Sequence, residues 1–235
     1  IVMFIEHKYL KFKGLNLTLE TLDGLLKHNG PLVNKSKMNR LISIKNFKNK
    51  INFSQYPSLE AQISSLSDDI AYNNHDIQDG IKAKLFSFKD LIEIDFFNEI
   101  YKSNKKNLTK KNLDILIYQI IRDSIDLMVK DLINNTIKNI QKFKIKSIKN
   151  VYNCPETLVS FSNKFKKIEK EIKFFLRLKM YNNKNVLLKN NKGKKIIKHL
   201  FNKISKKPSR FFNKEQLSKD KFRTISDYIA GMTDR

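Results

Sequence analysis

Glycine and proline are scarce in this sequence, with six glycines and four prolines among 235 residues. An all-β sandwich or barrel needs many tight turns, and tight turns depend on these two residue types. Apolar residues instead recur every three or four positions, a spacing that places them on one face of an α-helix. The sequence therefore predicts an all-α fold.

Helical periodicity runs through residues 1–12, 19–28, 59–79, 85–101, 108–149, 161–181 and 211–235, with an interruption near Leu217. Thr18 and Ser58 precede the second and third of these segments, and their hydroxyls are suited to accept backbone N–H groups at a helix start. Gly80 is expected to close the third segment. We expect an irregular loop at residues 32–55 and an Asn/Lys-rich break at residues 182–194.

The formal net charge of +24 first suggests a nucleic-acid partner, because clustered basic residues displace counterions from phosphate backbones. Only six of the 47 basic residues are arginine, however, and bidentate phosphate recognition favours the arginine fork. An AT-rich genome would enrich lysine, asparagine and isoleucine without selection for any ligand. We interpret the charge mainly as a solvated lysine surface, and weak binding of single-stranded nucleic acid stays open.

Cysteine content and hydropathy narrow the cellular setting. Cys154 is the single cysteine, which excludes an intramolecular disulfide and a cysteine-rich zinc site and fits a reducing compartment. No apolar run approaches the roughly 20 residues that a membrane-spanning helix needs. We therefore expect a cytoplasmic protein with no membrane partner.

One face of the segment at residues 59–79 carries polar groups at four-residue spacing. Asp68, Tyr72 and Asp76 lie one above another there, and Glu60 and Ser64 continue the stripe towards the start of the helix. Carboxylate oxygens are ligands that hard divalent cations prefer. The same spacing also occurs on ordinary solvated helices, so by itself it leaves a metal site and a solvated face as alternatives.

Five segments, in order along the chain, carry a specific resemblance. They are residues 14–24 (GLNLTLETLDG), 27–32 (KHNGPL), 57–62 (PSLEAQ), 68–76 (DDIAYNNHD) and 227–235 (DYIAGMTDR). Together they resemble the bacterial deoxyguanosinetriphosphate triphosphohydrolase-like proteins of the HD-domain superfamily. The matches extend almost from one end of the chain to the other.

The resemblance implies an HD-domain-type helical bundle with extra C-terminal helices. Residues 1–150 would form the C-terminal part of the catalytic helical domain, and residues 151–235 a helical region that packs on it. The implied activity is hydrolysis of a deoxynucleoside triphosphate such as dGTP to deoxynucleoside and inorganic triphosphate. The implied cofactor is a divalent metal, Mg or Mn, and family members usually assemble as homo-oligomers.

The resemblance also assigns roles to single residues. Asp68 matches the family's last metal-ligating aspartate, while Tyr72 and Asp76 match positions near the triphosphate and the sugar 3′-hydroxyl. Arg122 lies in another family-like segment, where a phosphate contact and an ordinary pair with Asp126 are both open. His28 either lines the nucleotide cleft or complements the C-terminal end of its helix.

The chain also departs from the family pattern. The family's first metal-ligating histidine, its His-Asp doublet and its catalytic histidines have no counterpart here, and His75-Asp76 belongs to a different motif. We therefore expect the C-terminal part of a longer enzyme, with no catalytic residue of its own and no activity alone. The alternative is a basic helical module that binds nucleic acid or mediates oligomerisation without catalysis.

Overall fold

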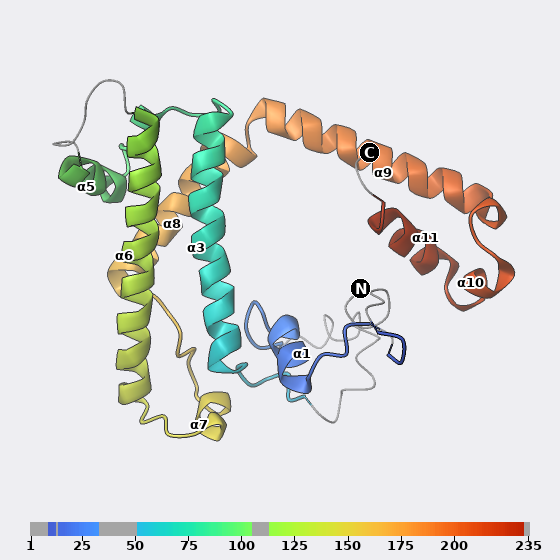
Figure 1. Ribbon diagram of the computed structural model, residues 1–235, viewed down its shortest axis with the longest axis horizontal. Helices are drawn as coiled ribbons and strands as arrows, with labels where there is room; N and C mark the ends of the chain where they lie inside the picture. Colours follow the sequence, from blue (N-terminus) through green and yellow to red (C-terminus); the bar gives the residue numbers. More distant parts are fainter. Residues whose placement is uncertain (1–8, 13, 33–50, 105–112, 233–235) are drawn as a thin grey trace. The chain divides into compact units, whose positions relative to one another are not determined.

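The computed structural model describes residues 9–12, 14–32, 51–104 and 113–232, and it contains helices and no β-strand in these ranges (Figure 1). The predicted all-α fold is therefore confirmed. The helices are α1 (Leu19–Leu26), α3 (Leu59–Lys82), α4 (Phe88–Leu91), α5 (Asp95–Asn104), α6 (Leu113–Lys142), α7 (Ile148–Tyr152), α8 (Asn163–Leu176), the π-helix η3 (Arg177–Tyr181), α9 (Lys184–Lys206), the 3-10 helix η4 (Pro208–Arg210), α10 (Lys214–Lys219) and α11 (Lys221–Ala230).

The chain divides into two compact units. The larger unit is Thr18–Tyr181, and the C-terminal unit combines Asn182–Arg235 with Ile1–Leu17. The division between residues 150 and 151 that the family resemblance implies stays a prediction. Within the described part of the chain, no helix is long and apolar enough to cross a membrane.

The predicted starts of α1 and α3 are confirmed. The Thr18 hydroxyl accepts the Thr21 amide at 3.3 Å, and the Ser58 hydroxyl accepts the Ala61 amide at 3.4 Å. After α1, Gly30 takes a φ of +92°, a conformation that glycine adopts without strain, and Pro31 follows it. These local signals therefore place both helices where their sequences predict them.

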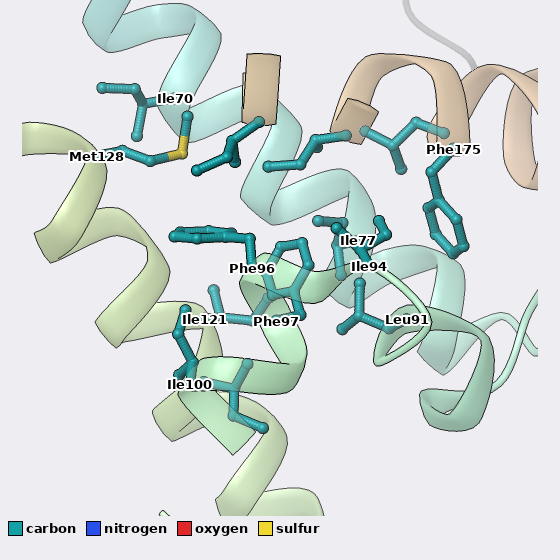
Figure 2. Packing of buried hydrophobic residues seen from close by; sticks show 14 of the residues in the cluster. Ile70, Ile77, Leu91, Ile94, Phe96, Phe97, Ile100, Ile121, Met128 and Phe175 are labelled. Atoms are coloured by element: carbon teal, nitrogen blue, oxygen red, sulfur yellow. The ribbon is translucent and has the colours of Figure 1, made fainter. Parts of the chain in front are cut away.

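The core of the larger unit is built around α3. Figure 2 shows Ile70 and Ile77 of α3 among apolar side chains from the neighbouring helices, including Ile121 and Met128 of α6. Helices α6 and α8 both pack against α3. The three- and four-residue spacing of the apolar residues in 59–79 also predicts burial of Ile63, but Ile63 is 45% exposed, so the prediction is wrong at this position.

Two long segments expected to be helical are each divided. Residues 85–101 form two helices, α4 and α5, which are separated at residues 92–94, and a reciprocal capping box between Ser87 and Asp90 starts α4. Within 108–149, α6 begins at Leu113 and ends at Lys142, residues 105–112 lie outside the described ranges, and α7 starts at Ile148. The 161–181 segment is α8 followed by the π-helix η3.

The expected break at residues 182–194 is wrong, because α9 runs through it from Lys184 to Lys206. Asn183 caps this helix by accepting the Asn185 amide at 3.0 Å. Lysine is a good helix former, and the segment contains no proline, so its unusual composition does not stop a helix. The interruption expected near Leu217 in the 211–235 segment occurs three residues later, at Asp220, which caps α11.

The first periodic segment is described only at residues 9–12, which are not helical. The remainder of that segment, residues 1–8, lies outside the described ranges, as do residues 33–50 of the expected loop. The described end of that loop, residues 51–55, is non-helical as expected.

Gly80 does not close α3, which continues to Lys82. Its lack of a side chain instead leaves room for the ring of Phe86. A Cβ atom at Gly80 would lie 2.2 Å from Cε1 of Phe86, and Phe86 in turn packs edge-on against Phe175 with ring centroids 4.8 Å apart. We predict that Gly80→Ala lowers the free energy of unfolding by about 1–3 kcal/mol through overpacking. Urea unfolding followed by circular dichroism measures this change.

Gly193→Ala is the matched control, because a Cβ atom at this position in α9 would meet no atom within 4 Å. Alanine is the better helix former, so this variant should gain up to about 1 kcal/mol. An unfolding midpoint for Gly80→Ala equal to or above that of the parent protein would contradict the overpacking argument.

Candidate functional site

The three acidic and phenolic residues expected on one face of α3 do share it, at differing depths. The Asp68 side chain is 71% exposed, Tyr72 is 57% exposed, and Asp76 is half-buried. The opposite side of α3 is buried against α6 and α8, which prevents the helix from turning. The polar stripe is therefore held on a rigid support.

A residue distant in sequence completes this stripe. The Tyr181 hydroxyl, at the end of η3, donates a short hydrogen bond to Oδ2 of Asp76. Burial, this bond and the neighbouring Tyr72 phenol raise the pKa of Tyr181 well above its ordinary value, so the hydroxyl keeps its proton. Tyr181 thereby fixes the orientation of the Asp76 carboxylate. Sequence reasoning missed Tyr181, because 105 residues separate it from Asp76 and no spacing relates them.

Asp68 has a histidine neighbour. Nε2 of His28 lies 3.8 Å from Oδ2 of Asp68, and the His28 carbonyl accepts the Ser65 hydroxyl at 2.7 Å. The second contact ties the loop after α1 to α3. Gly24 permits this close approach, since a Cβ atom there would lie 2.9 Å from Cβ of Ala61. His28 thus reaches the stripe from a separate element.

A divalent metal needs more ligands than this pair supplies. Across the described residues, no group of three or more His, Cys, Asp or Glu side chains is arranged to hold a metal ion. The residues present therefore do not fit a complete metal site, and Asp68 is at most one of its ligands. The assignment of Asp68 as a metal ligand stays a prediction.

Asp69, the acid next to Asp68 on α3, pairs with a lysine. Oδ2 of Asp69 lies 3.3 Å from Nζ of Lys173, which also pairs closely with Glu169. Burial opposes the charged form of Lys173, but the two carboxylates outweigh it and raise the lysine pKa. Asp69 thus joins α3 to α8, while Asp68 points to the loop after α1.

A cavity of about 450 Å³ opens beside His28 in the larger unit. Its wall combines the loop after α1 with a segment that follows α7. Charged and polar groups in the wall include His28, Ser65, Thr157, Lys166 and Glu169. The cavity is not lined by any of the predicted site residues Asp68, Tyr72, Asp76 and Arg122. The His28 side chain, however, reaches both the cavity wall and Asp68. The cavity and the stripe are therefore adjacent parts of one region.

Buried Gln62 holds the far wall of this cavity. Its Oε1 accepts hydrogen bonds from the Thr157 hydroxyl and from the amides of Leu158 and Val159, at 3.0 to 3.2 Å. Its Nε2 donates to the Pro57 carbonyl at 2.9 Å. Sequence reasoning missed this role. The signal was present, because Gln62 lies four residues before Leu66 on the face that continues to buried Ile70.

Helix α6 holds the same wall from another direction. Asn135 and Asn139 donate side-chain hydrogen bonds to the carbonyls of Ser160 and Leu158 at 2.7 and 2.8 Å. Asp131 accepts the Ser162 amide at 2.8 Å. A segment without regular structure is thus positioned by polar side chains from two helices.

Arg122 lies exposed on α6, where its guanidinium donates to Oε1 of Gln119 at 2.8 Å. The pair with Asp126 that spacing suggested is not formed, because Asp126 pairs with Lys130 at 2.7 Å. A phosphate-binding role for Arg122 stays a prediction.

Comparison with known proteins adds the family context. Residues 159–235 match the family described as the phosphohydrolase-associated domain. Over all 235 residues, the chain is 68% identical to the deoxyguanosinetriphosphate triphosphohydrolase-like protein of Pelagibacter ubique (strain HTCC1062). The resemblance to the deoxyguanosinetriphosphate triphosphohydrolase-like proteins is therefore confirmed. The protein of the same name from Rickettsia rickettsii (strain Iowa) is 35% identical over 241 aligned residues.

The chain spans 63% of the length of the Pelagibacter relative and 62% of that of the Rickettsia relative. These relatives, together with the phosphohydrolase-associated domain, place the chain among relatives of phosphohydrolases.

The Gln62 contacts lead to a stability prediction. Gln62→Leu removes the acceptor of two buried amides and should lower the free energy of unfolding by about 1–3 kcal/mol, the cost of leaving buried polar groups unsatisfied. Hydrogen exchange at the Leu158 and Val159 amides, measured by NMR, should accelerate in this variant.

Thr157→Val is the control, because it removes one Gln62 contact and leaves both amides bonded. Unchanged protection of the two amides in Gln62→Leu would show that Gln62 does not hold this segment.

Proposed function

We propose that this chain provides part of the substrate site of a metal-dependent enzyme that hydrolyses deoxynucleoside triphosphates to deoxynucleoside and inorganic triphosphate. The observation that carries the proposal is the stripe on rigid α3, in which Asp68 and Tyr72 are exposed and half-buried Asp76 is oriented by Tyr181. The names of the relatives agree with this reaction. The activity belongs to the whole protein, of which this chain is one part.

In this proposal Asp76 accepts the 3′-hydroxyl of the sugar. A carboxylate is an acceptor with several lone pairs, so Asp76 can bind a second donor while Tyr181 holds one of its oxygens. Because Tyr181 keeps its proton, it orients the carboxylate without adding negative charge next to a polyanionic substrate. Tyr72, beside Tyr181 and largely exposed, offers a phenol to the triphosphate.

Asp68 contributes one ligand to the divalent metal, Mg or Mn, in this proposal. Its exposure leaves the carboxylate accessible, and Nε2 of His28 lies 3.8 Å from its Oδ2. The other ligands would come from the region that the relatives have and this chain does not span. Arg122 would contact phosphate, and the enzyme would work in the cytoplasm as a homo-oligomer.

Removal of the proposed metal ligand gives the first test. In the full-length protein, Asp68→Ala should lower kcat by more than about 100-fold, since metal-site residues support both affinity and rate. Metal content, measured by inductively coupled plasma mass spectrometry, should fall in parallel.

Asp69→Ala is its control, because Asp69 is the adjacent acid but pairs with Lys173. Asp68→Ala protein that retains the metal content and turnover of the parent would overturn the assignment.

The proposed sugar contact gives the second test. Asp76→Ala should raise KM for a deoxynucleoside triphosphate by about 10-fold or more, with a smaller change in kcat, because it removes a charge-assisted hydrogen bond that positions the substrate. Tyr181→Phe should change KM in the same direction, because the carboxylate is then no longer held.

A 2′,3′-dideoxynucleoside triphosphate provides the control substrate, since it lacks the hydroxyl that Asp76 would accept. Parent and Asp76→Ala proteins should have similar KM values for it. An equal penalty on both substrates would mean that Asp76 does not recognise the 3′-hydroxyl.

A further inference from the structure

The C-terminal unit has a charge distribution unlike that of the larger unit. Residues 182–214 contain ten lysines and one arginine but no Asp or Glu, so all 23 acidic residues of the chain lie elsewhere. A general lysine enrichment explains many lysines, but it does not explain a region without carboxylates. Helix α9 occupies most of this region.

Basic residues form a stripe along one face of α9. Its members are Lys192, Lys195, His199, Lys203 and Lys206, which follow one another at spacings of three, four, four and three residues. This spacing keeps them on one face of a helix, over about 21 Å at 1.5 Å per residue. All five are exposed. We call this set the α9 stripe.

Near its C-terminal end, α9 packs its other face into a core. Buried Ile204 and partly buried Phe201 pack with Phe212 and with Ile225 of α11 in the core of the C-terminal unit. Phe201 also stacks on Phe222 with ring centroids 6.1 Å apart. The stripe is thus on the side of the helix that this core leaves exposed.

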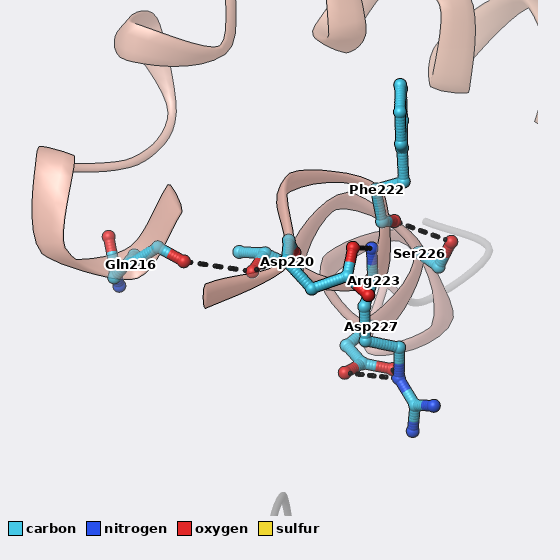
Figure 3. Close-up of polar contacts among 7 residues, drawn as sticks. Gln216, Asp220, Phe222, Arg223, Ser226 and Asp227 are labelled. Carbon is cyan, nitrogen blue, oxygen red and sulfur yellow. Dashed lines mark hydrogen bonds and ion pairs between the residues drawn. The ribbon is translucent and has the colours of Figure 1, made fainter. Parts of the chain in front are cut away.

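The acids of α11 and its cap do not neutralise the stripe. Asp227 accepts a hydrogen bond from Nε of Arg223 at 2.9 Å, and Asp220 accepts the Arg223 amide at 3.0 Å. Both contacts are drawn in Figure 3. The stripe cations are without a salt-bridge partner among the residues that the structure describes.

We propose that the α9 stripe binds the phosphodiester backbone of nucleic acid without reading its sequence. A row of cations on one straight face suits a linear polyanion, because each lysine that neutralises a phosphate releases condensed counterions. Lysine is a flexible point charge, which positions a backbone and does not discriminate bases. Helix α9 belongs to the C-terminal unit and Asp68–Asp76 to the larger unit, and the proposal uses no residue of that site, so it does not rest on the hydrolase activity.

An anionic membrane fits the geometry less well. An amphipathic helix that lies on a membrane buries its apolar face in the lipid. In α9 that face is covered at Phe201 and Ile204 by the core of the C-terminal unit, so only the exposed residues before them, such as Ile196 and Ile197, could enter the lipid. A second copy of the chain is also a poor partner for the stripe, because it carries the same charge of +24.

The test compares two sets of four substitutions in the full chain. The stripe variant replaces Lys192, Lys195, Lys203 and Lys206 with glutamine, which removes four charges and preserves helix propensity. The control variant makes the same replacement at four exposed lysines of the larger unit, Lys138, Lys164, Lys167 and Lys170. Circular dichroism establishes that both variants keep the helical content of the parent.

Binding is measured by fluorescence anisotropy with a labelled 20-nucleotide DNA, as a single strand and as a duplex, at several salt concentrations. The slope of log K against log salt should decrease in magnitude by about 3–4 in the stripe variant and by less than about 1 in the control. The stripe variant should also bind at least about 10-fold more weakly at low salt. The form with the steeper stripe-dependent slope identifies the preferred ligand, strand or duplex.

Equal losses in the two variants would overturn the proposal, because they would show attraction by total charge alone. Unchanged binding in the stripe variant would overturn it as well. Anionic phosphatidylserine vesicles are the competing probe. Stripe-dependent binding to vesicles without stripe-dependent binding to DNA would identify a membrane surface instead and would also reject the proposal.

Discussion

The rotation of α3 about its own axis controls the candidate site. Burial of Ile70 and Ile77 against α6 and α8 fixes one face of this helix inward. Since each residue advances the helix by about 100°, the rotational orientation of α3 determines which side chains lie on its other faces. Asp68 and Tyr72 become exposed, Asp76 lies at intermediate depth where Tyr181 reaches it, and Gln62 is buried where it can bind a neighbouring segment. The polar arrangement is thus a consequence of apolar packing.

Around α3, some polar side chains hold neighbouring segments in place, and others stay exposed. Gln62, Asn135 and Asn139 satisfy the backbone of residues 157–160, which no regular structure would otherwise satisfy. Asp69 pairs with Lys173, whereas its neighbour Asp68 stays largely exposed. Adjacent acids on one helix therefore have different surroundings, since positions one residue apart point about 100° apart.

Local signals predicted the helices well where a cap or a strong period was present. Thr18 and Ser58 start their helices as predicted, and the four-residue spacing of the α3 stripe places its members on one face. Composition was a poor guide at residues 182–194, because an Asn/Lys-rich sequence without proline can still form a helix. The contacts of Asp76 with Tyr181 and of Gln62 with residues 157–159 could not be predicted, since each joins residues about 100 positions apart through the tertiary fold.

The π-helix η3 sets the direction in which Tyr181 leaves the helix. A π-helix turn holds more residues than an α-helix turn, and such turns occur frequently at functional sites. Each residue of η3 therefore advances around the helix axis by less than the 100° of an α-helix, so α-helical winding of the same five residues would point Tyr181 in another direction. The hydrogen bond from its hydroxyl to Asp76 thus depends on this wider turn, although the same side chains would be present with either winding. Orientation of this carboxylate is therefore set by local helix winding as well as by residue identity.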